Sequence, residues 1–206
     1  NIQLNNWNRH MKLRNLKIKN FRSVEYADIE IHNYTMLVGA NNAGKSNIMA
    51  ALRAFYEDIS WMAKDDNPKF NDTNIDNDDF ESWVELHFEL SDDEWVNLAE
   101  LHKDQKLPNT LVVRRYFVHK DRVKKSQSNI YSVVDGVVNE TLFYGAKNIG
   151  TAKLGSIIYI PALISANDQI KTSGASPLRD MLNLMLKKVI NSSPTYQQIT
   201  ESFFKF

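Results

Sequence analysis

Alternating apolar and polar positions predict that the chain opens with strands. Residues 13–18 alternate imperfectly, which is typical of a strand at a sheet edge, whereas residues 27–31 alternate regularly and predict a half-exposed strand. A bend at residues 20–23 separates the two segments. Residues 35–38 then form a short apolar run with β-branched members, which predicts a third and buried strand.

The middle of the chain carries the pattern of an antiparallel sheet. Ser91 and Glu94 form a capping box after the first strand of this region, which predicts a helix to about residue 105. Asp135-Gly136, between the last two strands, is a hairpin signal. The strands predicted here cover residues 83–90, 111–118, 130–134 and 137–144.

The last quarter of the chain is predicted to be a strand followed by helices. Residues 155–160 are a β-branched run that is typical of a central buried strand. Ser176 and Pro177 supply an N-cap and a first-turn proline for a helix to about residue 190. The leucines and methionines of that helix form one stripe, which is typical of a core face, and a further helix is predicted over residues 195–206.

A phosphate-binding loop, Gly39-x-x-x-x-Gly44-Lys45-Ser46, follows the third predicted strand. Its glycines let backbone N–H groups approach phosphate oxygens at a helix N-terminus, where the helix dipole also favours an anion. Lys45 is expected to reach the β- and γ-phosphates, and the Ser46 hydroxyl to ligate Mg²⁺. Apolar residues at i, i+4 and i+7 beyond the loop predict the helix. The residues expected to contact the nucleotide are Gly39, Ala40, Asn41, Asn42, Ala43, Gly44, Lys45, Ser46 and Asn47.

Composition limits the class of protein without identifying a partner. The 206 residues include 25 Lys+Arg and 25 Asp+Glu, so the net charge gives no sign of a nucleic-acid or membrane partner. The absence of cysteine excludes disulfides and thiolate metal sites and predicts a reducing, cytoplasmic location. No apolar run approaches the ~18 residues of a membrane span. Residues 1–10 are asparagine-rich and lack periodicity, so we expect a leader or cloning remnant ahead of Met11.

The bend and the phosphate loop together carry a family resemblance. Asn20-Phe21-Arg22-Ser23, followed by a Gly-x-Asn-x-x-Gly-Lys-Ser-Asn loop over residues 39–47, resembles the N-terminus of the ABC-type ATPases of DNA maintenance. That group includes the RecF and SMC proteins and the OLD (overcoming lysogenization defect) family of ATP-dependent nucleases. Residues 157–162 are similar to the strand that precedes the helical lobe of OLD-like ATPases.

The resemblance implies an α/β fold: a P-loop NTPase of ABC-ATPase type with an antiparallel β-subdomain and the start of a helical lobe, using ATP and Mg²⁺. Residues 11–175 are expected to form the ATPase lobe, with an acidic surface loop over residues 58–82, and residues 176–206 to begin the helical lobe. Residues 130–135 are the nearest match to a Walker B strand but are better interpreted as a hairpin. We therefore expect the N-terminal part of a longer ATPase, which is not catalytically complete by itself.

Other candidate site residues each have two interpretations. The resemblance places Arg22 and Ser23 near the nucleotide, so Arg22 either touches a phosphate or is a surface arginine at a strand end. Gln169 corresponds either to the glutamine that senses Mg²⁺ and the γ-phosphate or to a plain loop residue. A basic cluster is either a contact to the DNA backbone or the solvated face and turn of a hairpin. That basic cluster consists of Arg114, Arg115, Lys120, Arg122, Lys124 and Lys125.

Further metal sites are not supported by the sequence. Asp72, Asn74 and Asp76 match the first three ligand positions of a calcium loop, but the glycine and glutamate that the motif requires are absent. The histidines have no ligand spacing with carboxylates or with each other, which argues against a zinc site.

Three functions stay open from the sequence. The first is an ATPase head of the OLD-like class, in which two heads close around nucleotide as a homodimer and control DNA cleavage by a C-terminal Toprim nuclease; proteins of this kind often act in anti-phage defence. The second is a RecF- or SMC-like DNA-binding repair ATPase without nuclease activity. The third is a regulatory or scaffold subunit whose bound ATP is structural.

Overall fold

The computed structural model describes most of the first three quarters of the chain. The described residues are 11–69, 79–91, 94, 110–143, 154–160, 176, 178, 179, 181–183, 185 and 186. The chain divides into two compact units, Asn1–Gly155 and Ser156–Phe206.

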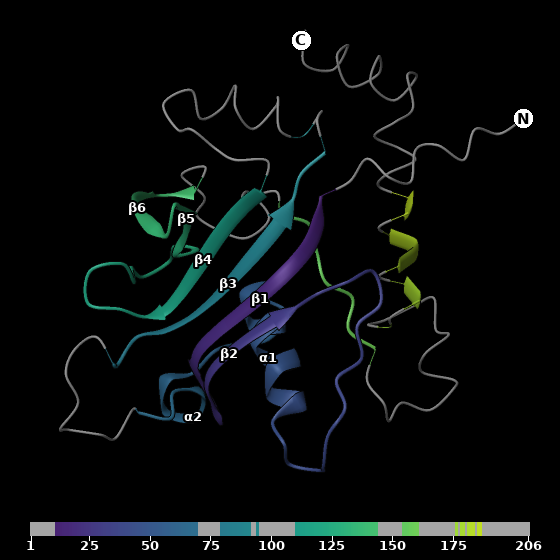
Figure 1. Cartoon of the computed structure of the whole chain (residues 1–206), viewed down its shortest axis with the longest axis horizontal. Helices are drawn as coiled ribbons and strands as arrows, with labels where there is room; N and C mark the ends of the chain where they lie inside the picture. Colours follow the sequence, from purple (N-terminus) through teal and green to yellow (C-terminus); the bar gives the residue numbers. More distant parts are fainter. Residues whose placement is uncertain are drawn as a thin grey trace, which may run out of the picture. The chain divides into compact units, whose positions relative to one another are not determined.

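A six-stranded antiparallel sheet forms the centre of the first unit (Figure 1). The spatial order of its strands is β2-β1-β3-β4-β5-β6, and each neighbouring pair is antiparallel. The predicted antiparallel sheet is thus confirmed, and the two opening strands belong to that same sheet. The strands are β1 (Lys12–Phe21), β2 (Val24–Glu30), β3 (Ser82–Glu89), β4 (Thr110–Val118), β5 (Ile130–Val134) and β6 (Val137–Leu142).

Helix α1 (Lys45–Phe55) packs on one face of this sheet, against β1 and β3. Antiparallel register places Leu16 opposite Leu86 and Ile18 opposite Val84, so an apolar face runs from strand to strand. These four side chains are at most 1% exposed. Small side chains on the helix let it approach the sheet closely. The buried residues of α1 are Ala50, Ala51, Ala54 and Phe55.

The opposite face of the sheet carries a ladder of alternating charges. Asp28, Lys17, Glu85 and Arg114 lie in successive cross-strand positions on β2, β1, β3 and β4. Arg114 Nε donates to Glu85 Oε2 at 2.8 Å, and its guanidinium lies 4.0 Å from the Trp83 ring centroid. Burial alone would raise the pKa of Glu85, but the hydrogen bond from His87 and the charge of Arg114 outweigh burial and hold that pKa below its ordinary value.

Two segments predicted as central buried strands, residues 35–38 and 155–160, do not form strands. Met36 and Val38 are 64% and 82% exposed, and Ile160 is 66% exposed. The β-branched composition indicates strand propensity, but a buried parallel strand also needs hydrogen-bonded neighbours on its edges. Neither segment pairs with another strand within the described part of the chain.

The acidic segment predicted as a surface loop contains a short helix, α2 (Ala63–Asp66). Asp66 is 3% exposed, so part of this segment packs into the unit and the surface-loop prediction is wrong at that point. The reason is long-range: Asp66 is the ion-pair partner of Arg22. The calcium-like pattern at Asp72, Asn74 and Asp76 lies outside the described residues.

Local signals at turns and caps are confirmed. Asp135 and Gly136 have φ values of 50° and 80°, and a type I′ hairpin turn requires positive φ at both central residues. The Ser91 backbone N–H donates to Glu94 Oε2 at 3.1 Å and the Glu94 backbone N–H donates to Ser91 Oγ at 3.4 Å, which are the two reciprocal bonds of a capping box. Arg179 N donates to Ser176 Oγ at 3.2 Å, which is the predicted N-cap.

The described residues of the leucine and methionine stripe beyond Ser176 are not buried, as the predicted core face would be. Met181, Leu182 and Met185 are 42%, 39% and 53% exposed. Helical periodicity identifies which side chains share a face, but only the tertiary arrangement decides whether anything covers that face.

Candidate nucleotide-binding site

The phosphate loop leads directly into α1. Gly44 is the N-cap of the helix and has φ 86°, a left-handed conformation that glycine adopts without a Cβ penalty. The first backbone N–H groups of a helix have no intrahelical acceptor, so they are available to an anion at this end. Residues 39–43 of the loop are exposed, whereas Gly44 and Lys45 are half-buried.

Lys45 lies across the loop. Its Nζ donates to the carbonyl oxygens of Gly39 and Ala40, at 2.7 Å in each case. The ammonium group is therefore held over the loop by carbonyl oxygens of the loop itself. Ser46, the next residue, is exposed at the first turn of α1.

The bend at the end of β1 contacts the loop through Ser23. Asn47 Nδ2 donates to Ser23 Oγ at 2.7 Å. A Cβ on Gly44 would lie 3.5 Å from the same Oγ atom. Residues that are far apart in the sequence thus meet at the nucleotide loop, and a role for Ser23 toward the nucleotide stays a prediction.

Arg22 is bonded to Asp66 through both its side chain and its backbone. Arg22 Nε donates to Asp66 Oδ1 at 2.7 Å, and the Arg22 backbone N–H donates to the Asp66 carbonyl oxygen at 2.6 Å. Asp66 Oδ2 accepts from the Met62 backbone N–H at 2.8 Å. Sequence reasoning missed Asp66 because nothing distinguishes it from the other acids of its segment. This ion pair uses Arg22 Nε, so a phosphate contact stays a prediction for the Nη groups of its guanidinium.

The chain matches the AAA ATPase domain family over residues 11–201. It belongs to that family. No curated protein matches the chain. Membership of the AAA ATPase domain family implies use of ATP, usually with Mg²⁺, which agrees with the geometry of the loop at residues 39–46. Among the described residues, no helix is long and apolar enough to cross a membrane.

Metal-ligand candidates of the AAA ATPase domain are few within the described ranges. Ser46 has the hydroxyl and the position that a Mg²⁺ ligand beside a phosphate needs. In the same ranges, no group of three or more His, Cys, Asp or Glu side chains could hold a metal ion. Gln169 lies outside the described residues.

The arginines of the basic cluster are not a continuous patch. Arg114 and Arg115 are consecutive on β4 and therefore point to opposite faces of the sheet. Arg114 pairs with Glu85, whereas Arg115 Nη1 donates to the Ala54 and Phe55 carbonyl oxygens at 3.2 and 2.7 Å. Arg122 Nη1 donates to the Asn139 carbonyl oxygen at 2.5 Å.

The lysines of the cluster differ from its arginines. Lys120, Lys124 and Lys125 are all exposed around the turn that connects β4 to β5. The three arginines are half-buried and bonded within the unit, so the lysines are the members open to an external phosphate. DNA binding by the cluster stays a prediction.

Proposed function

We propose that this AAA ATPase domain binds Mg²⁺–ATP at residues 39–47 and uses it to control DNA cleavage by an OLD-type Toprim nuclease, in a protein of anti-phage defence. The observation that carries the nucleotide assignment is the phosphate loop at the N-terminus of α1, with Lys45 placed across it. The nuclease part rests on the resemblance of residues 20–23 and 39–47 to OLD-like ATPases.

Each residue of the site has a chemical task in this proposal. Backbone N–H groups of the loop and of the first turn of α1 donate to the phosphate oxygens. Lys45 leaves the Gly39 and Ala40 carbonyls and neutralises the β- and γ-phosphates. Ser46 ligates Mg²⁺, which supplies further neutralisation of phosphate charge. Asn47 and Ser23 keep the bend against the loop through their hydrogen bond.

Replacement of Lys45 tests the nucleotide site. Lys45→Ala should weaken ATP binding by ~100-fold or more, because charge-assisted hydrogen bonds contribute ~1.5–3 kcal/mol each. A fluorescent ATP analogue in an anisotropy titration measures this affinity. Lys64→Ala, at an exposed position on α2, is the matched control and should bind like the unmodified protein. Equal affinity in both variants would refute the site.

The nuclease part requires a separate test with the protein that carries the proposed nuclease. ATP with Mg²⁺ should change the rate at which this protein cleaves plasmid DNA, and Lys45→Ala should abolish that dependence. Binding of DNA that depends on ATP, without cleavage, would instead support the RecF- or SMC-like alternative. Tightly bound ATP without turnover would support a structural nucleotide.

A further inference from the structure

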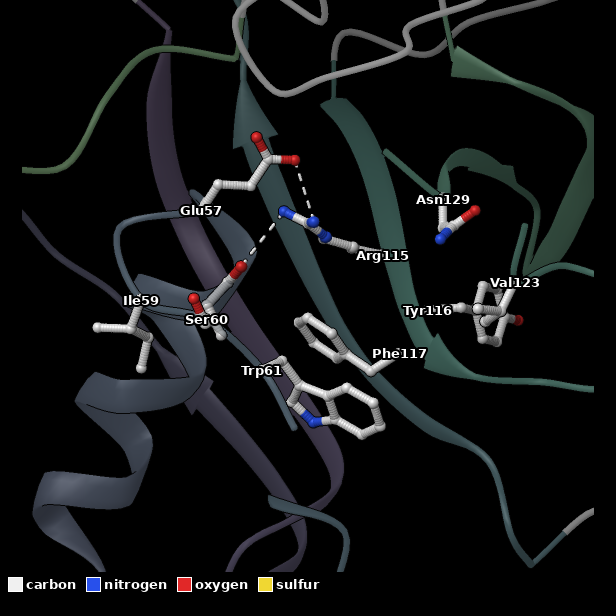
Figure 2. A pocket seen from close by; sticks show the side chains of 10 residues that line it. Glu57, Ile59, Ser60, Trp61, Arg115, Tyr116, Phe117, Val123 and Asn129 are labelled. Atoms are coloured by element: carbon white, nitrogen blue, oxygen red, sulfur yellow. Dashed lines mark hydrogen bonds and ion pairs between the residues drawn. The ribbon is translucent and has the colours of Figure 1, made fainter. Parts of the chain in front are cut away.

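A pocket of about 360 Å³ lies beside the C-terminal end of α1 (Figure 2). The phosphate loop is at the other end of that helix. This volume is in the range of small-molecule sites. Helix α1 has 11 residues, which corresponds to a length of ~16 Å between the two sites. The residues that line the pocket include Glu57, Ser60, Trp61, Arg115, Phe117 and Asn129.

The charges in the pocket are already balanced. Arg115 Nη2 lies 3.0 Å from Glu57 Oε1, and Arg115 Nη1 donates to the last carbonyls of α1 (Figure 2). Those carbonyls are the negative end of the helix dipole, so the guanidinium is compensated from two sides. An anion would meet Glu57 and this helix end, and a cation would meet Arg115. An uncharged ligand is therefore favoured.

Two buried N–H donors of the pocket residues lack an acceptor within the described ranges, Arg115 Nε and Trp61 Nε1, although buried donors are normally paired. Neither nitrogen is open to solvent, and the Arg115 guanidinium is held by Glu57 and the α1 carbonyls. The Trp61 indole is therefore the donor that can turn its N–H toward the cavity. A ligand that satisfies this donor must carry an acceptor oxygen, and an uncharged acceptor of this kind is a carbonyl group.

The wall of the pocket is aromatic. The rings of Trp61 and Phe117 are stacked, with centroids 5.6 Å apart and planes inclined by 21° (Figure 2). Offset stacking on such a wall favours a flat, unsaturated ring over a puckered one. Val123, which is 37% exposed, lies at the other side and is reachable from solvent.

We propose that this pocket binds an uncharged planar heterocycle with ring carbonyl groups, of the size of a nucleobase or nucleoside. The ring stacks on the aromatic wall, and a ring carbonyl oxygen accepts from the Trp61 indole N–H once the indole has turned toward the cavity. Arg115 also holds the C-terminal carbonyls of α1, so the ligand contacts the residue that anchors the helix of the phosphate loop. The site does not depend on the identity of the nucleotide at the other end of the helix.

Three small probes test this chemistry. Uracil is planar and uncharged, dihydrouracil has the same carbonyls on a puckered ring, and orotate is the planar ring with a carboxylate. Uracil should bind with a Kd on the order of 1 mM, as a fragment of this size can. Dihydrouracil should bind roughly fivefold more weakly for lack of stacking, and orotate more than roughly tenfold more weakly because its charge is uncompensated.

The indole ¹⁵N–¹H resonance of Trp61 reports binding directly, and its assignment follows from its absence in Trp61→Phe. Uracil should shift this resonance saturably. Val123→Phe, at the exposed rim, should narrow the pocket and abolish the shift, whereas Lys64→Ala should leave it unchanged. A missing or non-saturable shift with uracil, an equal response to all three probes, or a full response in Val123→Phe would overturn the proposal.

Discussion

Gly44 is the residue on which the shape of the phosphate loop depends most directly. Its φ of 86° is a conformation that L side chains rarely adopt, and the nearest atom to an added Cβ, Ser23 Oγ, is at an ordinary contact distance of 3.5 Å. The conflict for a larger residue therefore lies in the backbone and not in the space around it. Gly39 lacks this constraint, although its added Cβ would also lie 3.5 Å from a neighbour, Ala43 Cβ.

Gly44→Ala should lower the free energy of unfolding by ~1–2 kcal/mol, the cost of a left-handed conformation for an L residue, and should weaken ATP binding. Urea denaturation and the nucleotide titration measure the two effects. Gly39→Ala is the matched control for stability and should change it less. Equal stability losses in both variants would contradict the explanation from φ.

Protonation of Glu85 should lower the stability of the fold at acid pH. Its folded-state pKa lies below the ordinary value, because His87 and Arg114 together outweigh its burial. The ionised carboxylate therefore stabilises the fold above the unfolded-state pKa of ~4.3, and this contribution is lost as the pH falls through the lower folded-state pKa. Glu85→Gln should cost ~2 kcal/mol at neutral pH and should lose less stability in acid.

Urea midpoints measured from neutral to acid pH check the Glu85 prediction. Glu25→Gln, at an exposed position on β2, is the control and should keep the acid dependence of the unmodified protein. If the urea midpoint of Glu85→Gln changed with pH in the same way as that of the unmodified protein, this carboxylate would not be the cause of the stability loss in acid.

At the scale of elements, β4 and the turn that follows it divide one basic cluster into different roles. Consecutive residues of a strand point to opposite faces, so Arg114 joins the charge ladder while Arg115 reaches the end of α1. These two arginines are adjacent in the sequence, but their side chains lie on opposite faces of the sheet. The lysines of the turn are exposed and are the part of the cluster that can contact DNA.

Replacing Lys120, Lys124 and Lys125 with Gln should weaken DNA binding and reduce the slope of log K against log salt by up to about 2.7, because each neutralised phosphate contributes ~0.9. Anisotropy titrations at several salt concentrations measure the slope. Lys64→Gln should leave it unchanged. A slope that stays the same in the triple variant would identify the turn as a solvated surface only.

At the scale of the whole molecule, the pairing of strands separates the confirmed predictions from the wrong ones. The antiparallel strands find partners among the strands β1 to β6, and their alternation already indicates which face is buried. Residues 35–38 and 155–160 have equally good strand composition but no strand partner in the described chain. Composition therefore indicated strand propensity but neither strand pairing nor burial.

Self-association is the prediction that belongs to this scale. If two ATPase domains close around nucleotide, Mg²⁺–ATP should convert the protein from monomer to dimer, and Lys45→Ala should remain monomeric. Light scattering after size-exclusion chromatography, with and without nucleotide, gives the mass. A monomer under saturating ATP would contradict the homodimer.

By itself the sequence determined the features that depend on neighbours in the chain. The phosphate loop, the positive-φ turn at Asp135-Gly136 and the capping box at Ser91 are set by short spacings and by the conformational limits of glycine. The alternation of the strands likewise indicated an antiparallel sheet, although the limits of several strands shifted by one or more residues.

Only the tertiary structure decided which distant residues meet. It placed Ser23 against Asn47, paired Arg22 with the buried Asp66, and moved Arg115 from a supposed DNA contact to the end of α1. These contacts depend on strand order and on the face to which a side chain points. Local composition carries no information about either, so the phosphate loop was readable from the sequence and its supports were not.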